Sequence, residues 1–500
     1  MGLLKPHWSY SSVWANLVRD HRPLQLVLVH LDPATDEIVE HLGAGLECKC
    51  PPPHLPCFTL YEHLFVGQVK FHRKNAWPHP AAYSKANLES PRLIPTPLSQ
   101  SFSRALERLR KFPAEERRAR LARRHHLAPG NRAATATQVA RDLVGLHSTD
   151  PATVFVSAWA RMKNADVAGI ERELYDERSL VRVLVMRRTA FVLPPDLAAI
   201  ALAACSRSVG KVQRTRLQQW IEKAGMAKDA AAWLRQLEES TFEAVAARGT
   251  ASATQVSADV PLLQQKLVVA AGSRNEATVG LGPFVLRLLA VDGRLMRGRP
   301  RGGWLSTQWS WSTTETWLGK PMRAWTIHEA QVELVRAWLK RFGPATVEDM
   351  RWWTGWTLGE VRRALTDIKP VEVDLGDATG IALSGDLGPT RRPEPFAALL
   401  PGLDPTVMGW VGRDWYLGEH RAALFDRNGN AGPTIWWDCR VVGGWAQRRD
   451  GEIVIRLLED VGKDARAAID READRLRAWL GETRRVLPRF STPLVKELMA

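Results

Sequence analysis

A repeated helix start constrains the fold of this chain more than any other feature. Residues 135–143 (TATQVARDL) and 252–260 (SATQVSADV) are identical at five of nine positions, and residues 346–350 (TVEDM) keep the same spacing. Each begins Ser/Thr-x-x-Gln/Asp, in which the first hydroxyl and the fourth side chain satisfy each other's free backbone N–H groups at a helix N-terminus. The intervals between the three are too long for a solenoid repeat and indicate tandem domains.

The residues around the third start predict three helices followed by a hairpin. A helix over 329–342 ends at Gly343-Pro344, and capped helices begin at Thr346 and Thr357. Helix, helix, helix and hairpin is the winged helix-turn-helix order. The third hairpin is expected at 371–375 and 381–384.

The first two starts have related surroundings. Around the first we expect helices over 115–127, 135–145, 153–162 and 167–175 and strands at 181–186 and 189–193. After the second we expect a helix over 283–291 and a hairpin over 295–304.

The end of the chain changes to short strands. They are predicted at 407–411, 434–438, 440–445 and 452–457, with an amphipathic closing helix over 464–480. This pattern favours a small β-barrel-like domain with a C-terminal helix. The predicted fold is therefore α+β, with three tandem winged-helix units over 110–210, 211–325 and 326–390 and the barrel-like domain over 391–500.

Residues 1–105 differ in composition from the rest of the chain. Eight of the thirteen His and three of the five Cys precede residue 101, and the net charge is +1 there against +14 afterwards. The region contains Pro51-Pro52-Pro53 and one predicted strand, Leu24–Leu31. We expect a poorly ordered extension, or an upstream stretch translated from a misplaced start.

The cysteines and histidines of this extension leave two interpretations. Cys48, Cys50, His54, Cys57 and His63 carry zinc-ligating atoms, but zinc sites usually pair ligands at CxxC spacing and need a second pair at a distance. Here the ligands crowd into sixteen positions with three consecutive prolines among them. The sequence favours free thiols, and we expect neither a metal nor a cofactor.

The net charge of +15 calls for a polyanionic partner. It is spread along the chain without a membrane-type basic cluster, which favours phosphate backbones over lipid head groups. The sequence contains no signal-peptide pattern and no apolar run of about 18 residues. Five cysteines in so long a chain do not indicate a disulfide framework. We therefore expect a soluble, cytoplasmic protein that binds double-stranded DNA.

Five motifs in order then resemble one known family. They are Gly145-Leu-His-Ser-Thr-Asp-Pro151, Met186-Arg-Arg-Thr189, Phe342-Gly-Pro-Ala-Thr346, Leu400-Pro-Gly-Leu-Asp404, and Phe425-Asp-Arg-Asn-Gly-Asn-Ala-Gly-Pro433 with Trp437-Asp and Val441-Val-Gly-Gly-Trp445. Over about residues 113–485 the chain resembles the bacterial winged-helix DNA-binding family that includes the interstrand-crosslink-unhooking, azinomycin-resistance DNA glycosylases. The resemblance implies three tandem winged helices and a β-barrel around a DNA-sized concave face.

The resemblance also points to a candidate active site. Characterised glycosylases of the family carry Gln-apolar-Gln or Gln-apolar-Asp directly after Gly-Leu, where this chain has His147-Ser148-Thr149. A neutral His147 would accept the proton of an attacking water near pH 7, with the Thr149 hydroxyl holding that water. The alternative is that both residues cap or terminate the preceding helix before Asp150-Pro151.

Five arginines are candidates for DNA contact on predicted exposed elements. Arg297, Arg299 and Arg301 lie at the predicted tip of the second hairpin, where they meet phosphate or a minor groove unless the tip is only solvated. Arg362 and Arg363 follow each other on the predicted recognition helix. Because adjacent residues point in different directions, we expect only one of them to face DNA.

Two further arginines, and the tryptophans, carry open alternatives. Arg161 and Arg188 lie near the family's motifs and either clamp phosphates or form buried salt bridges. The 21 Trp are candidates for stacking on DNA bases. We expect most of them to be core residues, with one of Trp352-Trp353 and one of Trp436-Trp437 buried.

Two functions are therefore compatible with the sequence. The first is a DNA glycosylase that removes bulky or N7-alkylated purines and unhooks crosslinks. The second is a non-catalytic DNA-binding protein, such as a transcriptional regulator or a lesion-shielding factor. A regulator is usually a dimer that reads a palindrome, whereas a chain with three winged helices needs no dimer, so we expect a monomer.

Overall fold

The computed structural model describes residues 109–269, 276–481, 486 and 488–500, together with six strands between residues 13 and 69. The chain divides into two units, Met1–Ile94 and Pro95–Ala500. The strand predicted at Leu24–Leu31 is present, and five others were not predicted. The zinc candidates at positions 48–63 lie outside the described residues. The first unit contains β1 (Val13–Leu17), β2 (Gln25–Asp32), β3 (Glu37–His41) and β6 (Gln68–Val69) in one antiparallel sheet, and β4 (Gly45–Glu47) paired with β5 (Thr59–Tyr61).

The first part of the second unit is a helical segment closed by a three-stranded antiparallel sheet of order β8-β10-β9. The predicted helix start at Thr135 is confirmed, since its hydroxyl accepts the Gln138 N–H at 3.1 Å. The elements are β7 (Arg110–Lys111), α2 (Ala114–Arg124), α3 (Ala136–Asp142), β8 (Leu146–His147), α4 (Pro151–Trp159), α5 (Val167–Glu171) continued by a π-helical turn (Arg172–Asp176), β9 (Val181–Leu184) and β10 (Ala190–Leu193).

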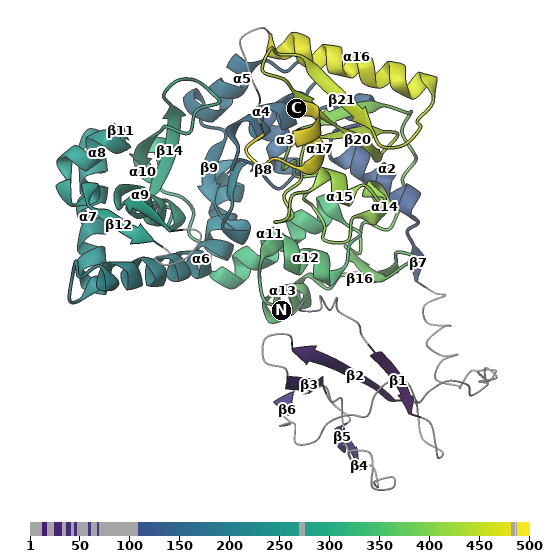
Figure 1. Cartoon of the computed structure of the whole chain (residues 1–500), viewed down its shortest axis with the longest axis horizontal. Helices are drawn as coiled ribbons and strands as arrows, with labels where there is room; N and C mark the ends of the chain where they lie inside the picture. Colours follow the sequence, from purple (N-terminus) through teal and green to yellow (C-terminus); the bar gives the residue numbers. More distant parts are fainter. Residues whose placement is uncertain are drawn as a thin grey trace, which may run out of the picture. The chain divides into compact units, whose positions relative to one another are not determined.

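The next part has a hydrophobic core of its own. Figure 1 shows its helices and strands gathered at one end of the long helix α6, away from α16. The capping box predicted at Ser252 and Gln255 is present in both directions. The elements are α6 (Pro195–Lys223), α7 (Ala230–Arg248), β11 (Ala251–Ser252), α8 (Ala253–Asp259), β12 (Lys266–Val269), β13 (Ala277–Gly280), α9 (Gly282–Val291), β14 (Leu295–Pro300), β15 (Trp309–Thr313) and α10 (Thr314–Leu318).

The third part has the predicted order of three helices and a hairpin. Capping boxes begin the second helix at Thr346 and the third at Thr357, as predicted. The hairpin gains a third, parallel strand from β7, more than 250 positions earlier, so Phe112 packs against Val373. The elements are α11 (Ile327–Phe342), α12 (Val347–Thr354), α13 (Leu358–Ile368), β16 (Val371–Asp374) and β17 (Thr379–Ala382).

The last part is an open four-stranded antiparallel sheet, which corrects the prediction of a barrel. Among the described residues its order is β18-β19-β20-β21, too few strands to close on themselves. The strand expected at 407–411 is a series of turns, in which Gly409 packs so closely on Phe342 that a Cβ would lie 2.7 Å from its ring. The elements are β18 (Ala397–Leu400), α14 (Asp414–Leu417), α15 (Arg421–Leu424), β19 (Thr434–Trp437), β20 (Arg440–Gln447), β21 (Ile453–Leu457), α16 (Lys463–Leu480) and α17 (Pro493–Met499).

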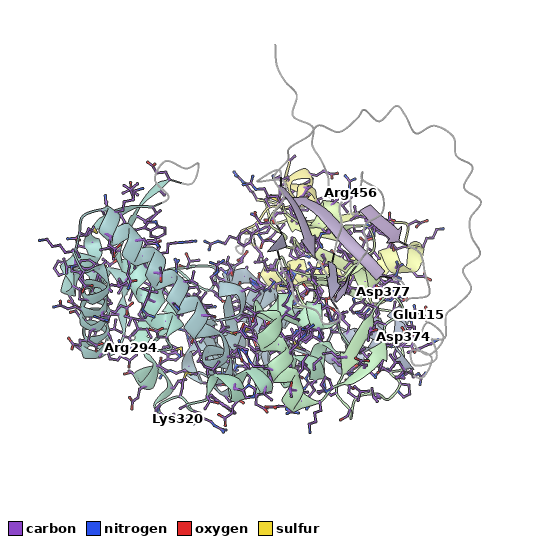
Figure 2. All side chains as sticks on the ribbon, turned by 90° about the horizontal axis from the view of Figure 1, so that it is seen from below. Glu115, Arg294, Lys320, Asp374, Asp377 and Arg456 are labelled. Atoms are coloured by element: carbon purple, nitrogen blue, oxygen red, sulfur yellow. The ribbon has the colours of Figure 1, made fainter. Side chains whose placement is uncertain are left out.

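One continuous core joins the first, third and last parts, and the second part reaches into it. Trp304, from the connection between β14 and β15, packs on Phe155 of α4 with ring centroids 4.5 Å apart. Of the paired tryptophans, Trp353 and Trp436 are buried, as expected. Figure 2 shows Arg294 and Lys320 on the second part, on the far side of the unit from Glu115, Asp374 and Asp377. Because Trp304 packs on Phe155, the β14–β15 hairpin is anchored against the main core.

Candidate active site

The candidate segment is the outer strand of a small sheet. β8 pairs with β10, so that His147 lies opposite Phe191, and the Ser148 N–H continues the ladder by donating to Ala190 O at 2.8 Å. The preceding Gly145 has a φ of +110°, and a Cβ there would lie 3.0 Å from the Leu193 and Phe191 side chains. The Gly-Leu pair thus brings the chain out of α3 and close against β10.

His147 is a buried, neutral imidazole. Its side chain packs against Phe191, with ring centroids 5.2 Å apart, and its Nδ1 has no hydrogen-bond partner among the described residues. Burial, helped by the nearby charge of Arg187, lowers the pKa of His147 to about 3. A proton acceptor with so low a pKa is a weak general base at neutral pH. The ring can still accept a hydrogen bond.

The residues after His147 have separate roles. Ser148 is buried, and its Oγ accepts a hydrogen bond from Nε of Arg182. Thr149 is half-buried. Asp150 is the N-cap of α4, since its Oδ1 accepts the Ala152 N–H at 3.0 Å, and burial raises the pKa of this carboxyl. Because α3 already ends at Asp142, His147 and Thr149 do not cap or terminate that helix, and this alternative is wrong.

Arg187 and Arg188 occupy the turn between β9 and β10 with φ values of 50° and 61°. Such left-handed backbone is costly for residues with a Cβ and is often retained at functional positions. The Arg187 guanidinium lies 4.1 Å from the Trp352 ring, and Arg413 lies 5.0 Å from the same ring. Burial and the Arg413 charge lower the pKa of Arg187 to about 10. Arg188 is exposed.

Arg161 has the buried salt bridge that the sequence left as one of two alternatives. The side chain is fully buried and makes a two-pronged pair with Asp404 at 2.7 and 2.9 Å. It also donates to Thr406 Oγ1, Ser157 O and His125 O, so all five N–H donors are used. No donor remains for a phosphate, and the expectation that Arg161 binds DNA is corrected.

The three arginines predicted at one hairpin tip do not lie together at the tip in the structure. Arg297 and Arg299 are within β14, and only Arg301 belongs to the connection, where Gly302 and Gly303 have positive φ. The misleading residue is Gly298, which is a packing position rather than a turn. A Cβ there would lie 2.5 Å from Ser310 and 2.9 Å from Trp317.

Their surroundings differ as well. Arg299 forms ion pairs with Asp176 at 2.9 Å and Glu171 at 3.4 Å, whereas Arg301 is exposed. Arg297 is half-buried beside Trp311, and burial with the charges of Arg182 and Arg287 lowers its pKa to about 10.

Arg182 is the residue at this site that the sequence did not single out. It lies in β9, is 4% exposed, and stacks 3.9 Å from the centre of the Trp309 ring while it donates to Ser148. Its position inside an ordinary-looking strand contained no signal, because Ser148 lies 34 positions earlier. It links the candidate segment directly to the β14–β15 hairpin.

The remaining candidates and cavities lie elsewhere. Arg362 and Arg363 are both exposed on α13. A groove of about 700 Å³ lies along α6 and α11, and one of about 520 Å³ is lined by Arg124, Arg336, Lys340 and Arg341 among others. Neither groove includes His147 or Thr149. In the part of the chain that the structure describes, no cluster of His, Cys, Asp or Glu suits a metal, and no helix is long and apolar enough to cross a membrane.

Comparisons with known proteins agree on one family. The family described as DNA glycosylase AlkZ-like matches residues 140–479. An interstrand DNA cross-link repair glycosylase from Streptomyces sahachiroi is 24% identical over 348 residues, which cover 68% of this chain and 89% of that protein. The solved structure of the Streptomyces sahachiroi DNA glycosylase AlkZ has a TM-score of 0.59 at 23% identity and covers 76% of this chain and all of that one. The chain therefore belongs to the AlkZ-like DNA glycosylase family.

Proposed function

We propose that this protein is a DNA glycosylase that removes N7-alkylated or otherwise bulky purines from duplex DNA, including those held in crosslinks. The observation that carries the proposal is the buried, unpartnered Nδ1 of His147. The resemblance of the Gly145–Pro151 motif to the family suggests this segment as the active site. Because buried polar atoms are nearly always paired, a buried ring nitrogen without a partner has hydrogen-bonding capacity left for a ligand.

The low basicity of His147 favours one class of lesion. An N7-alkylated purine is already cationic and leaves without protonation, so the transition state is rich in oxocarbenium character and the water needs little help from a base. His147 accepting a hydrogen bond from that water, with the Thr149 hydroxyl beside it, would suffice. Uncharged lesions, which need a proton on the leaving base, should not be processed.

The proposed partner is double-stranded DNA held mainly through its phosphates. We interpret the three helical parts, each followed by a β-hairpin, as winged helices, and the exposed Arg188, Arg301, Arg362 and Arg363 as phosphate contacts. With several contact elements on one chain, we propose a monomer that acts in the cytoplasm.

A second function, lesion binding without turnover, is favoured by one specific observation. With a pKa of about 3, His147 is a far weaker base than a histidine in solution. A protein that holds and shields alkylated DNA would need the same arginines and no proton acceptor.

Base release separates the two functions. Under single-turnover conditions with enzyme in excess, a duplex containing N7-methylguanine and a duplex containing uracil are incubated with the protein, and the free base is quantified. We expect N7-methylguanine to be released and uracil to be retained. Tight binding of both duplexes without any release of N7-methylguanine would establish the binding protein instead.

A further inference from the structure

Two arginines beside the candidate site have no carboxylate to neutralise them. Arg182 in β9 and Arg297 in β14 are neighbours across two packed strands, close enough for each charge to act on the other. Neither forms an ion pair with any residue that the structure describes. Arg299, two positions along β14, instead pairs with Asp176 and Glu171. On β14, the absence of a carboxylate partner therefore distinguishes Arg297 from Arg299.

Aromatic rings hold both guanidinium groups in place. Trp309 and Trp311, two residues apart on β15, lie under Arg182 at 3.9 Å and beside Arg297 at 5.3 Å. An aromatic face stabilises a cation without using its N–H groups. One terminal nitrogen of Arg182 and Nε of Arg297 are buried and make no hydrogen bond. The hairpin thus orients the two guanidinium groups, and some of their N–H donors remain without an acceptor.

Such an arrangement is unfavourable unless an anion joins it. Two like charges near each other in a partly buried site repel, and buried donors without acceptors carry a desolvation cost. Arg287 on α9 adds a third positive charge beside Arg297. A phosphate supplies both the missing negative charge and acceptor oxygens in the geometry that arginine prefers.

We propose that Arg182 and Arg297 together bind one phosphate of the DNA backbone beside the nucleotide that enters the site at His147–Thr149. The inference rests on the proposed function, because it takes that segment as the place where the lesion is held. Arg182 is the link: the guanidinium that faces the phosphate also donates to Ser148, between the two candidate catalytic residues. Binding of this phosphate would therefore fix the position of the DNA strand relative to the active site.

A phosphate-neutralisation scan tests the pair directly. Methylphosphonate, which removes one backbone charge, is placed singly at each position around an abasic-site analogue in a duplex, and affinity is measured by fluorescence polarisation. For the wild-type protein, one position should weaken binding roughly tenfold or more, as expected for loss of a charged hydrogen-bonded pair. Arg297→Gln should bind the unmodified duplex about as weakly, with no further loss at that position.

Arg294→Gln is the matched control. Arg294 lies three residues before Arg297, is tied to Glu239 at 2.9 Å, and lies on the same part of the molecule (Figure 2). This variant should retain the full methylphosphonate penalty of the wild type. Arg297→Lys, which keeps the charge and loses the planar fork, should show an intermediate penalty, and it provides a second test if Arg297→Gln does not fold.

The outcomes separate this proposal from the glycosylase proposal, because affinity is read without base release. Equal methylphosphonate penalties in wild type and Arg297→Gln at every position would overturn the phosphate site even if base is released. Loss of the penalty only in the Arg297 variants would support the site even if no base is released. A melting temperature that rises with inorganic phosphate in both proteins, joined to equal penalties, would assign the anion to another place and also overturn the proposal.

Discussion

Two groups of arginine in this protein, the paired group (Arg161) and the unpaired group (Arg182 and Arg297), differ in the presence of a carboxylate partner. Arg161 is fully buried, pairs with Asp404 through two hydrogen bonds, and uses every one of its donors. Arg182 is almost as deeply buried, yet it has no acidic partner among the described residues and one nitrogen makes no hydrogen bond. Both belong to a chain with a large excess of positive charge.

The difference indicates what each group is for. A buried charge whose partner is built into the fold serves the fold, and removing that partner is costly. A buried charge without a partner is tolerated where a ligand supplies it. By this criterion Arg161 joins the end of α4 to the turn after β18, whereas Arg182 and Arg297 form a phosphate site.

The largest effect is expected from breaking the Arg161 pair. Asp404→Asn leaves a buried guanidinium without its counter-charge and should lower the free energy of unfolding by about 3–5 kcal/mol. Urea or thermal unfolding measures the change. Removing both charges in Arg161→Met with Asp404→Leu should recover much of the loss, since an apolar pair of similar volume can replace a buried ion pair. If the single variant is as stable as wild type, Arg161 is not structural.

The second effect concerns two of the buried histidines, His125 beside Arg161 and His147 in the candidate segment. Burial, with Arg161 beside it, holds the pKa of His125 well below 6.5, and His147 has a pKa of about 3. Below pH 6.5 the unfolded chain binds protons that the folded chain does not, so stability present above pH 6.5 is lost as the pH falls. Each histidine should contribute about 1.4 kcal/mol per pH unit down to its folded pKa.

Replacing one histidine checks that assignment. His147→Gln should reduce the slope of unfolding free energy between pH 6 and 4.5 by about half of the two histidines' joint contribution. An unchanged slope would mean that His147 titrates normally in the folded protein.

A smaller effect is expected from the unpaired group. Arg297→Gln removes a charge that Arg182 repels and loses the contact with Trp311, and these changes largely offset each other. We expect stability within about 1 kcal/mol of wild type, measured by the same unfolding experiment. A loss as large as that of Asp404→Asn would contradict the contrast between the two groups.

The smallest effect on folding is expected from the exposed arginines. Arg301→Ala, Arg362→Ala and Arg363→Ala should leave the melting temperature unchanged. Each one that contacts phosphate should weaken duplex binding and flatten the slope of log affinity against log salt by about one. Because neighbours on α13 point in different directions, we expect Arg362 and Arg363 to differ in this assay. Arg299→Ala, already paired with Asp176, should change the slope less.

Local features were predictable from sequence, and contacts between distant residues were not. The helix starts at Ser252, Thr346 and Thr357 were predicted because a capping box is complete within four residues. The partner of Arg161 lies 243 positions away, so periodicity alone left two fates open for that side chain. The candidate segment was found by resemblance, whereas its low-polarity surroundings emerged only from the packing of β8 against β10.

Two sequence-based expectations, on the hairpin tip at Gly298 and on the basicity of His147, changed because of packing that the sequence does not show. Gly298 suggests a turn in the sequence, but it is a glycine because Trp317 packs against it, and this moved the predicted hairpin tip by several residues. The pH dependence expected of His147 changes as well. A histidine near its usual pKa would lose activity below about pH 6, whereas a pKa of about 3 predicts base release that is constant from pH 8 to about pH 5.

The most direct test of the account is single-turnover release of N7-methylguanine by wild type, His147→Ala and Thr149→Ala, with affinity for undamaged duplex measured alongside. We predict that His147→Ala slows release by about 100-fold, at the lower end of what a positioned proton acceptor contributes, while affinity changes only a few-fold. No release by wild type would contradict the enzyme function, and full activity in the double variant His147→Ala/Thr149→Ala would contradict this location of the active site.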